Sequence, residues 1–326
     1  MKAIVYHNYG SPDVLQCEEI AQPTAGDNEV VIKVRAAGVN PYDWHFMRGL
    51  PYLVRIVAGL LKPKVKRLGA DVAGRVEAVG RNVKQFKPDD EVFGSCSGAF
   101  SGAFAEYACA PESAFVMKPD NVTFEQAASV PIAALTALQG LRDKGKIQPG
   151  QRVLVNGAAG GVGTFAVQIA KSFGAEVTGV CSTRNVEIVR SIGANQVIDY
   201  TQEDFTKGGQ RYDLILDAVG NHSLSACRRV LNPKGILVMA GGEGGRWMVR
   251  ALARAITALV MSRFVSQNLV GIFARLNKED LNALGELMAA GKVTPVIDRR
   301  YKLSEVPEAI RYLEEGHARG KVVITL

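Results

Sequence analysis

The sequence feature that most constrains the fold is a glycine-rich turn between an apolar strand and a helix. The run Arg152–Asn156 leads directly into Gly157-Ala158-Ala159-Gly160-Gly161-Val162-Gly163, which is followed by the helix-type sequence TFAVQIAKSFGA. A tight strand-to-helix turn needs residues without a bulky Cβ, and so does a backbone that approaches a pyrophosphate closely. The free N–H groups and partial positive charge of a helix N-terminus favour phosphate binding. In this context the pattern Ala158-x-Gly160-x-x-Gly163 predicts a dinucleotide site, and the alternative is a glycine-rich turn of an unrelated α/β fold.

Strand-like and helical runs alternate around this turn, from about residue 123 onward. Near-continuous apolar strands that alternate with helices indicate a parallel sheet covered on both faces. Six such strands match a doubly wound dinucleotide-binding fold. The expected strands are Arg152–Asn156, Glu176–Cys181, Gln196–Tyr200, Tyr212–Val219, Gly235–Ala240 and Leu269–Phe273.

The residues before this α/β region follow a different pattern, of short strands separated by turns. Runs rich in Val and Ile at Ala3–Tyr6, Glu29–Arg35 and Asp71–Val79 are separated by turn-forming Gly, Pro, Asn and Asp residues. This pattern predicts an antiparallel, partly closed β domain. The run KVVITL at Lys321–Leu326 is a strand signal outside the βα alternation, and we expect it to pair with this first domain.

The end of the second strand of the α/β region selects the cofactor. An NAD-selective site places Asp or Glu there, about 20 residues beyond the glycine turn, on the ribose 2′-hydroxyl. This chain has Cys181-Ser182-Thr183-Arg184-Asn185 and no carboxylate before Glu187. The guanidinium of Arg184 and the hydroxyl of Ser182 suit a 2′-phosphate, so NADPH is expected in preference to NADH. The alternative is a solvated loop with an ordinary surface arginine.

Composition narrows the setting and the partners. Lys plus Arg number 39 and Asp plus Glu 32, a net charge of +7, and no nucleic-acid-binding motif accompanies this mild excess. The five cysteines are scattered without a C-x-x-C pair, which argues against a disulfide framework or a Cys-rich structural zinc site. The start MKAIVYHNYG does not match a signal peptide, and no segment has the roughly 18 uncharged apolar residues of a membrane span. We therefore expect a soluble protein in a reducing, cytoplasmic compartment.

A series of short motifs spans essentially the whole chain. The motifs are Ala36–Trp44, Gly69–Gly74 with Val79-Gly80, Asp90–Gly94, Asn156–Gly163, Asp217–Gly220 and Gly316–Val323. Together and in this order they resemble the medium-chain dehydrogenase/reductase superfamily, in its zinc-independent quinone oxidoreductase-like branch. The resemblance implies a GroES-like, β-rich catalytic domain at residues 1–122 and a Rossmann NADPH-binding domain at 123–275. It also implies a C-terminal segment, 276–326, that returns to the catalytic domain, and a homodimer.

The motifs depart from those of the zinc-dependent alcohol dehydrogenases of this superfamily. Where those enzymes carry a Cys and a His ligand, this chain has Asn40 and Ala70, and the third ligand falls near Ile132, which has no donor atom. Catalytic zinc needs three protein ligands and an open position, so no catalytic zinc is expected. Without a metal to lower the pKa of an alcohol, reduction is the easier direction. The resemblance then implies hydride transfer from NADPH to a hydrophobic quinone or α,β-unsaturated carbonyl, with the protein supplying position, a dry pocket and hydrogen-bond donors.

Candidate site residues follow from the motifs and the resemblance. Asn40 is expected to donate to a developing oxyanion or to the cofactor ribose, and Tyr42 and Tyr52 are candidate proton donors, with packing as the alternative for both tyrosines. Asp71 is expected to order its loop rather than to perform acid–base chemistry. The resemblance implies that Lys321 lies near the cofactor, and the alternative is a plain surface lysine. The expected cofactor contacts are Asn40, Thr136, Ala159, Gly160, Gly161, Val162, Gly163, Ser182, Arg184, Tyr200, Val219, Ala240, Gly241, Phe273 and Lys321.

Two acid-free segments combine basic and apolar residues. Tyr52–Arg67 carries five basic residues among aliphatic ones, and no acid lies between Glu243 and Glu279. In the second segment, residues 246–263, arginines spaced by four form one stripe of a helix beside Trp247 and aliphatic residues. The segments are interpreted as a lid over a hydrophobic substrate, as a weak peripheral contact with an anionic membrane, or as core or dimer packing with solvated arginines.

Two other functions fit the glycine turn equally well. One is an alcohol dehydrogenase of the same fold with a non-standard metal site, which predicts stoichiometric zinc and alcohol oxidation. The other is a non-catalytic NADPH-binding sensor or scaffold, which predicts cofactor binding without turnover.

Overall fold

The computed structural model describes residues 1–98, 102–241, 256–258 and 265–326. Contacts divide the chain into two units. Unit 1 comprises Met1–Ala133, Leu276–Gly291 and Pro295–Leu326, and unit 2 comprises Ala134–Arg275 and Lys292–Thr294. The domain boundaries expected from the sequence remain a prediction.

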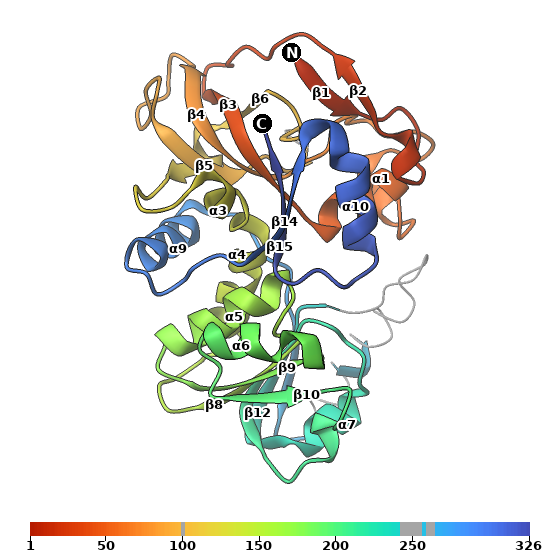
Figure 1. The fold of residues 1–326 in the computed structure, drawn as a ribbon, viewed down its shortest axis with the longest axis vertical. Coiled ribbons are helices and arrows are strands. Elements are labelled where there is room, and N and C mark those ends of the chain that lie inside the picture. The colour runs from red at the N-terminus through yellow and green to blue at the C-terminus, as the bar shows by residue number, and fades with distance from the viewer. Residues whose placement is uncertain (99–101, 242–255, 259–264) are drawn as a thin grey trace. The chain divides into compact units, whose positions relative to one another are not determined.

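Unit 1 is built mainly of strands (Figure 1). They are β1 (Lys2–Val5), β2 (Gln16–Glu19), β3 (Glu29–Val39), β4 (Asp71–Val79), β5 (Glu91–Ser95), β6 (Tyr107–Pro111), β7 (Phe115–Met117), β14 (Ile297–Lys302) and β15 (Lys321–Thr325). The helices are α1 (Pro41–Arg48), α2 (Val54–Ala58), α3 (Phe124–Ala128), α9 (Lys278–Ala289) and α10 (Val306–Glu314), with short turns η1 (Pro12–Val14), η3 (Glu112–Ala114) and η7 (Leu303–Glu305). Helix α4 (Pro131–Gln139) begins in unit 1 and ends in unit 2.

The main sheet of unit 1 brings distant parts of the chain together. Its described strands are ordered β14-β15-β3-β4-β5-β7, with β6 also paired to β3. Strand β15 runs antiparallel to β3, with Val322 opposite Val39, and parallel to β14. Strand β4 is antiparallel to β3 and places Asp71 opposite Gly38. The first residues of β4 and β15 therefore lie beside the last residues of β3.

One apolar core holds this sheet in place. Val30, Ile32 and Val34 of β3 point into it, and α10 adds Val306 and Ile310, which lie one helical turn apart. Burying an aliphatic side chain of this size stabilises the fold by about 1.5–3 kcal/mol. The core thus fixes the strand ends at which polar residues gather.

Unit 2 alternates strands and helices, as its hydrophobic pattern predicts. Its strands are β8 (Arg152–Asn156), β9 (Glu176–Cys181), β10 (Gln196–Asp199), β11 (Tyr212–Asp217), β12 (Leu231–Met239) and β13 (Asn268–Gly271). Its helices are α5 (Gly161–Ser172), α6 (Val186–Ser191) and α7 (Leu224–Arg229), with the π-helical turn η4 (Gly140–Lys144) and the short turns η5 (Thr183–Asn185) and η6 (Phe205–Lys207).

The described strands of unit 2 form one parallel sheet in the order β10-β9-β8-β11-β12-β13. This is the doubly wound order of a dinucleotide-binding fold, and the predicted α/β class with a β-rich first domain is confirmed. Strand β12 begins at Leu231 rather than at Gly235, because Leu231 already pairs with Tyr212 of β11 before the register shifts and Ile236 pairs with Leu214.

Helices of unit 2 pack on the sheet beside the strands they connect. Helix α5 contacts β8 and β9, and α6 contacts β9 and β10 (Figure 1). The strand order reverses at β8, which lies between β9 and β11, and ligands of such sheets bind at the carboxyl ends of the strands at this reversal. Within the described ranges, none of the helices has the length and apolar character needed to cross a bilayer.

Candidate functional site

The turn between β8 and α5 is shaped by glycines at positions where a side chain does not fit. Gly157 has a left-handed backbone (φ 85°), and its N–H and that of Ala158 both donate to the carbonyl of Val180. A Cβ on Gly163 would lie 2.0 Å from the carbonyl oxygen of Gly157, so only glycine allows the helix to pack this close to the strand end. The turn therefore has one tightly packed side.

The other side of the turn is open. Gly160 is the N-cap of α5 and offers no side chain to the helix, and a Cβ there would meet only the Gly157 oxygen, at 3.4 Å. The first N–H groups of a helix have no partner within it, and in α5 these are the N–H groups of Gly161, Val162 and Gly163. A site with free N–H groups, a helix dipole and room for backbone approach fits the diphosphate of a dinucleotide.

The residues predicted to bind the ribose 2′-phosphate follow the end of β9. Ser182 accepts a hydrogen bond at Oγ from Asn185 Nδ2 (3.1 Å), and Arg184 is exposed on the short turn between them. Asn185 is buried, and its Oδ1 has no hydrogen-bond partner among the described residues. The buried amide holds Ser182 in place beside an exposed guanidinium, an arrangement that suits a phosphate monoester.

Asp217, the last residue of β11, organises the neighbouring strand ends. Its Oδ1 accepts from Asn156 Nδ2 (2.9 Å) and from the N–H groups of Val219 (3.2 Å) and Gly220 (2.8 Å). Its carbonyl oxygen accepts from the N–H groups that follow β12, Ala240 (2.9 Å) and Gly241 (3.2 Å). The sequence pattern alone did not single out Asp217 for this role, although a carboxylate at the end of an apolar strand was a usable signal.

The carboxyl edge of the sheet collects most of the predicted cofactor residues of unit 2. The glycine turn follows β8, Ser182 and Arg184 follow β9, and Val219 follows β11. Ala159 is buried in the turn, and Ala240 and Gly241 follow β12. Tyr200 follows β10 and is 56% exposed, and Phe273 lies just past β13 and is 89% exposed. Thr136 is half-buried on α4. The roles of these residues as contacts stay predictions.

Unit 1 contains a buried polar cluster at the ends of β3, β4 and β15. Lys321 Nζ donates to Asn40 Oδ1 and to the carbonyl of Val39 (3.3 Å), and it lies 3.9 Å from Asp71 Oδ2. Asn40 Nδ2 donates to Asp71 Oδ2 (2.9 Å) and to Gly38 O (3.4 Å). Lys321 is only 3% exposed, so the alternative of a plain surface lysine is wrong. Both amide hydrogens of Asn40 are thus engaged within the cluster.

The two aspartates of this cluster hold backbone in place. Asp71 accepts from the N–H of Ile132 (3.2 Å), in the first turn of α4, and so caps that helix from a neighbouring strand. Asp43 accepts from the N–H groups of Asn40 (2.8 Å) and Gly69 (3.0 Å), which ties the start of α1 to the loop before β4. The expectation that Asp71 orders its loop agrees with these contacts.

Burial dominates the electrostatics of the cluster. It raises the pKa of Asp43 to about 7, because desolvation and the nearby Asp71 outweigh the two backbone hydrogen bonds. Desolvation also raises the pKa of Asp71 to about 6, although Lys321 and Asn40 act in the opposite direction. The pKa of Lys321 is lowered by burial, against the attraction of Asp71 and Asp43. The cluster is one coupled set of charges in a dry environment.

The two candidate proton donors lie near the same loops but are less buried. Tyr42 is half-buried on α1, its ring packs on Phe46 (centroids 4.4 Å apart), and its Oη accepts from the N–H of Gly98 (2.9 Å). Tyr52 is half-buried, with the guanidinium of Arg55 5.1 Å from its ring centre. These contacts are compatible with packing and with catalysis, so the proton-donor role stays a prediction.

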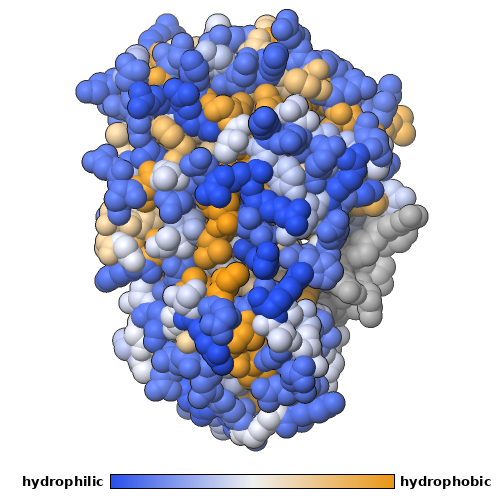
Figure 2. Space-filling view, viewed as in Figure 1, coloured by the Kyte–Doolittle hydropathy of each residue, from blue (hydrophilic) through white to orange (hydrophobic). Residues whose placement is uncertain are grey.

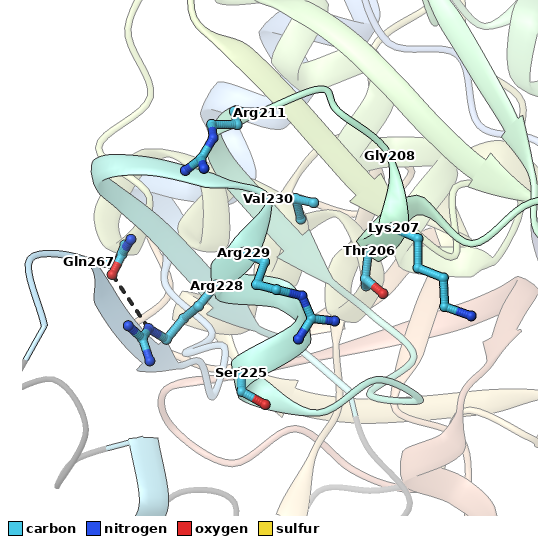
Figure 3. A pocket seen from close by; sticks show the side chains of 9 residues that line it. All are labelled: Thr206, Lys207, Gly208, Arg211, Ser225, Arg228, Arg229, Val230 and Gln267. Carbon is cyan, nitrogen blue, oxygen red and sulfur yellow. Dashed lines mark hydrogen bonds between the residues drawn. The ribbon is translucent and has the colours of Figure 1, made fainter.

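A basic hollow of about 740 Å³ lies elsewhere on unit 2 (Figure 3). It is formed at the amino ends of β11, β12 and β13, the edge opposite the glycine turn. Its polar lining includes Lys207, 3.6 Å from Asp204, and Arg228, whose Nε donates to Gln267 Oε1 (3.4 Å). No residue predicted for the cofactor lines it, so this hollow is separate from the nucleotide site.

The positions aligned with zinc ligands carry no ligand side chains. Ala70 is fully buried, and Ile132, whose side chain is a hydrocarbon, donates its backbone N–H to Asp71. Across residues 1–98, 102–241, 256–258 and 265–326, no three His, Cys, Asp or Glu side chains lie close enough together to hold a metal ion.

Comparison with known proteins was made at the level of families and of whole chains. The family model described as alcohol dehydrogenase GroES-like domain matches residues 26–120, and that described as zinc-binding dehydrogenase matches residues 192–324. Among curated relatives, an NADPH-dependent alkenal/one oxidoreductase of Arabidopsis thaliana chloroplasts is 37% identical, over 99% of this chain and 79% of its own length.

Solved structures agree over the full length of the chain. The quinone oxidoreductase from Coxiella burnetii is 32% identical and superimposes with a TM-score of 0.88, over 100% of this chain and 99% of that chain. The Escherichia coli quinone oxidoreductase complexed with NADPH is 26% identical, with a TM-score of 0.84 over 100% of both chains.

Proposed function

Because the chain belongs to the medium-chain dehydrogenase/reductase superfamily, as a quinone oxidoreductase-like member, we propose that it reduces quinones or α,β-unsaturated carbonyl compounds with NADPH. The observation that carries this proposal is the open, uncapped N-terminus of α5 behind the glycine turn. A dinucleotide diphosphate is bound by such backbone N–H groups at a helix N-terminus.

In this proposal the residues of unit 2 bind and orient the cofactor. The N–H groups of Gly161, Val162 and Gly163 hold the diphosphate, and Ser182 and Arg184 hold the 2′-phosphate. When bound, NADPH supplies the hydride that the reduction requires. Asp217 contributes indirectly, since it fixes the backbone of Val219 and Gly220 next to the turn.

In this proposal the residues of unit 1 set the polarity around the substrate and protonate the reduced product. We assign Asn40 to a polar position held rigidly by Lys321 and Asp71, and Tyr42 and Tyr52 to proton donation towards the reduced product. The amide hydrogens of Asn40 bond Asp71 and Gly38, so donation to a developing oxyanion requires exchange of the longer bond, to Gly38 (3.4 Å).

The proposed reaction proceeds without zinc. Asn40 and Ala70 replace the Cys and His of the zinc-dependent pattern, and Asn40 is already engaged by Lys321 and Asp71. The family model that matches residues 192–324 is nevertheless described as zinc-binding dehydrogenase, so metal content is a direct test. Less than about one-tenth of an equivalent of zinc in fully active protein supports the proposal, and activity that scales with bound zinc supports an alcohol dehydrogenase with a non-standard site.

The central experiment follows NADPH oxidation with a quinone such as 1,2-naphthoquinone and with an enone, each compared with NADH. We expect turnover with NADPH and a kcat/KM for NADPH at least about tenfold above that for NADH. Tight NADPH binding with no turnover on either class of acceptor would identify a binding protein instead of a reductase.

We also propose a homodimer in a reducing, cytoplasmic compartment. All five cysteines are free, which favours a reducing environment. Sedimentation equilibrium measures the mass in solution, and localisation of the tagged protein identifies the compartment; a monomer or an organellar signal contradicts the corresponding part.

A further inference from the structure

Unit 1 exposes a concentrated apolar patch next to α2. Leu53, Ile56, Val57, Leu60 and Leu61 are 54% to 90% exposed. They account for five of the twelve large hydrophobic side chains exposed among the described residues. The face drawn in Figure 2 is mostly hydrophilic, and apolar side chains are also exposed on it. A concentration of this kind marks an interaction surface.

The backbone that carries the patch is anchored to unit 1. Ala58, Gly59 and Pro63 are buried, and the N–H of Lys64 donates to the carbonyl of Ala58 (2.8 Å). Tyr9 Oη donates to Gly59 O (2.6 Å), and the guanidinium of Arg55 lies 4.5 Å from the Tyr9 ring centre. The apolar side chains therefore project outward from a held loop.

Positive charge lies directly beside the apolar side chains. Lys62, Lys64 and Lys66 are exposed, and no acidic residue occurs between Asp43 and Asp71. We define the 53–67 patch as Leu53, Ile56, Val57, Leu60, Leu61 and these three lysines. The second basic apolar segment, residues 246–263, lies outside the described residues except for 256–258.

We propose that the 53–67 patch docks onto a membrane surface that contains anionic lipid. Aliphatic side chains insert at the boundary of the acyl chains, while lysines remain at the level of the charged headgroups. Protein interfaces are instead enriched in aromatic residues and arginine and depleted in lysine, so the aliphatic and lysine composition favours lipid over a protein partner. The proposal goes beyond the reductase activity and does not depend on it.

The test is co-sedimentation of the full-length protein with vesicles. One set is pure phosphatidylcholine, and the other replaces roughly one lipid in three by phosphatidylglycerol. We expect binding to the anionic vesicles only, and we expect it to weaken steeply when the salt concentration is raised to about 0.5 M.

Two variants separate the charged and apolar contributions. Lys62→Gln/Lys64→Gln/Lys66→Gln is expected to weaken binding roughly a hundredfold, since each lysine near an anionic surface contributes about fivefold. Leu60→Ser/Leu61→Ser, at the two sites 70% and 90% exposed, is expected to weaken it at least about tenfold. Matched controls on the same unit are Lys33→Gln/Lys84→Gln/Lys87→Gln and Met117→Ser, which change exposed residues elsewhere and leave binding intact.

The outcomes distinguish the occupants of the patch. Thermal unfolding checks that each variant is folded, since all altered side chains are exposed. Equal binding to neutral and anionic vesicles, no binding to either, or unchanged binding of both patch variants overturns the proposal. Self-association that Leu60→Ser/Leu61→Ser abolishes, without vesicle binding by the parent, assigns the patch to a second copy of the chain instead.

Discussion

The candidate sites of the two units are built from different parts of the chain. In unit 2 the candidate site is made of backbone, and its defining residues are glycines that leave space around the N-terminus of α5. In unit 1 it is made of side chains, with Lys321, Asn40 and Asp71 filling each other's hydrogen-bonding capacity in a dry interior. The comparison teaches that a site for a large charged ligand depends on space left open by glycines, whereas a rigid buried polar cluster depends on side chains that satisfy one another's hydrogen bonds.

The largest expected effect comes from filling the tight side of the turn in unit 2. Gly163→Val places a side chain where even a Cβ would lie 2.0 Å from the Gly157 oxygen. We expect a loss of at least about 3 kcal/mol in the free energy of unfolding, measured by urea denaturation, and loss of NADPH binding.

Gly160→Ala is the matched control for the open side. Its Cβ meets only the Gly157 oxygen, at 3.4 Å, so the free energy of unfolding changes by less than about 0.5 kcal/mol. The methyl group occupies ligand space, and the Kd for NADPH rises about tenfold by fluorescence titration. Equal effects of the two substitutions on stability would remove the distinction between the two sides of the turn.

Breaking the charge pairing of unit 1 should cost a comparable free energy of unfolding, without the loss of NADPH binding. Lys321→Met leaves the buried Asp71 without its nearest cation and Asn40 Oδ1 without its donor, at about 3–5 kcal/mol. Lys2→Met, at an exposed lysine of β1, is the control. The double variant with Asp71→Asn should lose less than the sum of the single losses, and additive losses would show that the two residues do not interact.

The cluster also predicts a pH dependence of stability. The folded protein holds the protons of Asp43 and Asp71 up to a pKa of about 7 and about 6, whereas unfolded aspartates release them near their ordinary value. The unfolded chain therefore binds fewer protons, and the free energy of unfolding falls as pH rises from about 5 to 7, on the order of 1 kcal/mol per pH unit. Denaturation at several pH values measures the slope. Asp43→Asn should flatten it and Asp89→Asn, at an exposed loop position, should not; a slope of opposite sign in the parent would contradict the burial argument.

The smallest expected effect concerns recognition of the ribose 2′-phosphate, which distinguishes NADPH from NADH. Arg184→Glu replaces an exposed cation beside Ser182 by an anion, so the ratio of kcat/KM for NADPH to that for NADH should fall at least about tenfold. Arg190→Glu, on the exposed face of α6, is the control. An unchanged ratio in the Arg184 variant would show that the 2′-phosphate is bound elsewhere.

The sequence was informative about unit 2 because its signals are local. Apolar runs predicted each strand of the parallel sheet, and the glycine turn follows β8 where it was expected. Asp217 was missed as an organising residue because Asn156, its side-chain partner, is 61 positions away and meets it only when β8 and β11 are adjacent.

The polar cluster of unit 1 was harder to predict from the sequence because its contacts are long-range. Lys321 and Asn40 are 281 positions apart, and Asn40 and Asp71 are 31 apart, so no window of sequence contains the cluster. The predicted pairing of KVVITL with the first domain is confirmed by its contact with β3. The sequence did not predict that β15 lies between β14 and β3, the position that buries Lys321. A lysine that begins an otherwise apolar strand was the available hint.

The place of β15 within the sheet has a consequence for the order in which the protein is made. The strands β8 to β13 are complete once residue 271 has been translated, so the parallel sheet can assemble while the ribosome is still adding the rest. The main sheet of unit 1 cannot be completed until the end of translation, because the strand that lies between β14 and β3 starts only at Lys321. A pause or early stop in translation after unit 2 would therefore release a chain with a finished nucleotide cradle and an unclosed β-sheet, exposed to chaperones and proteases.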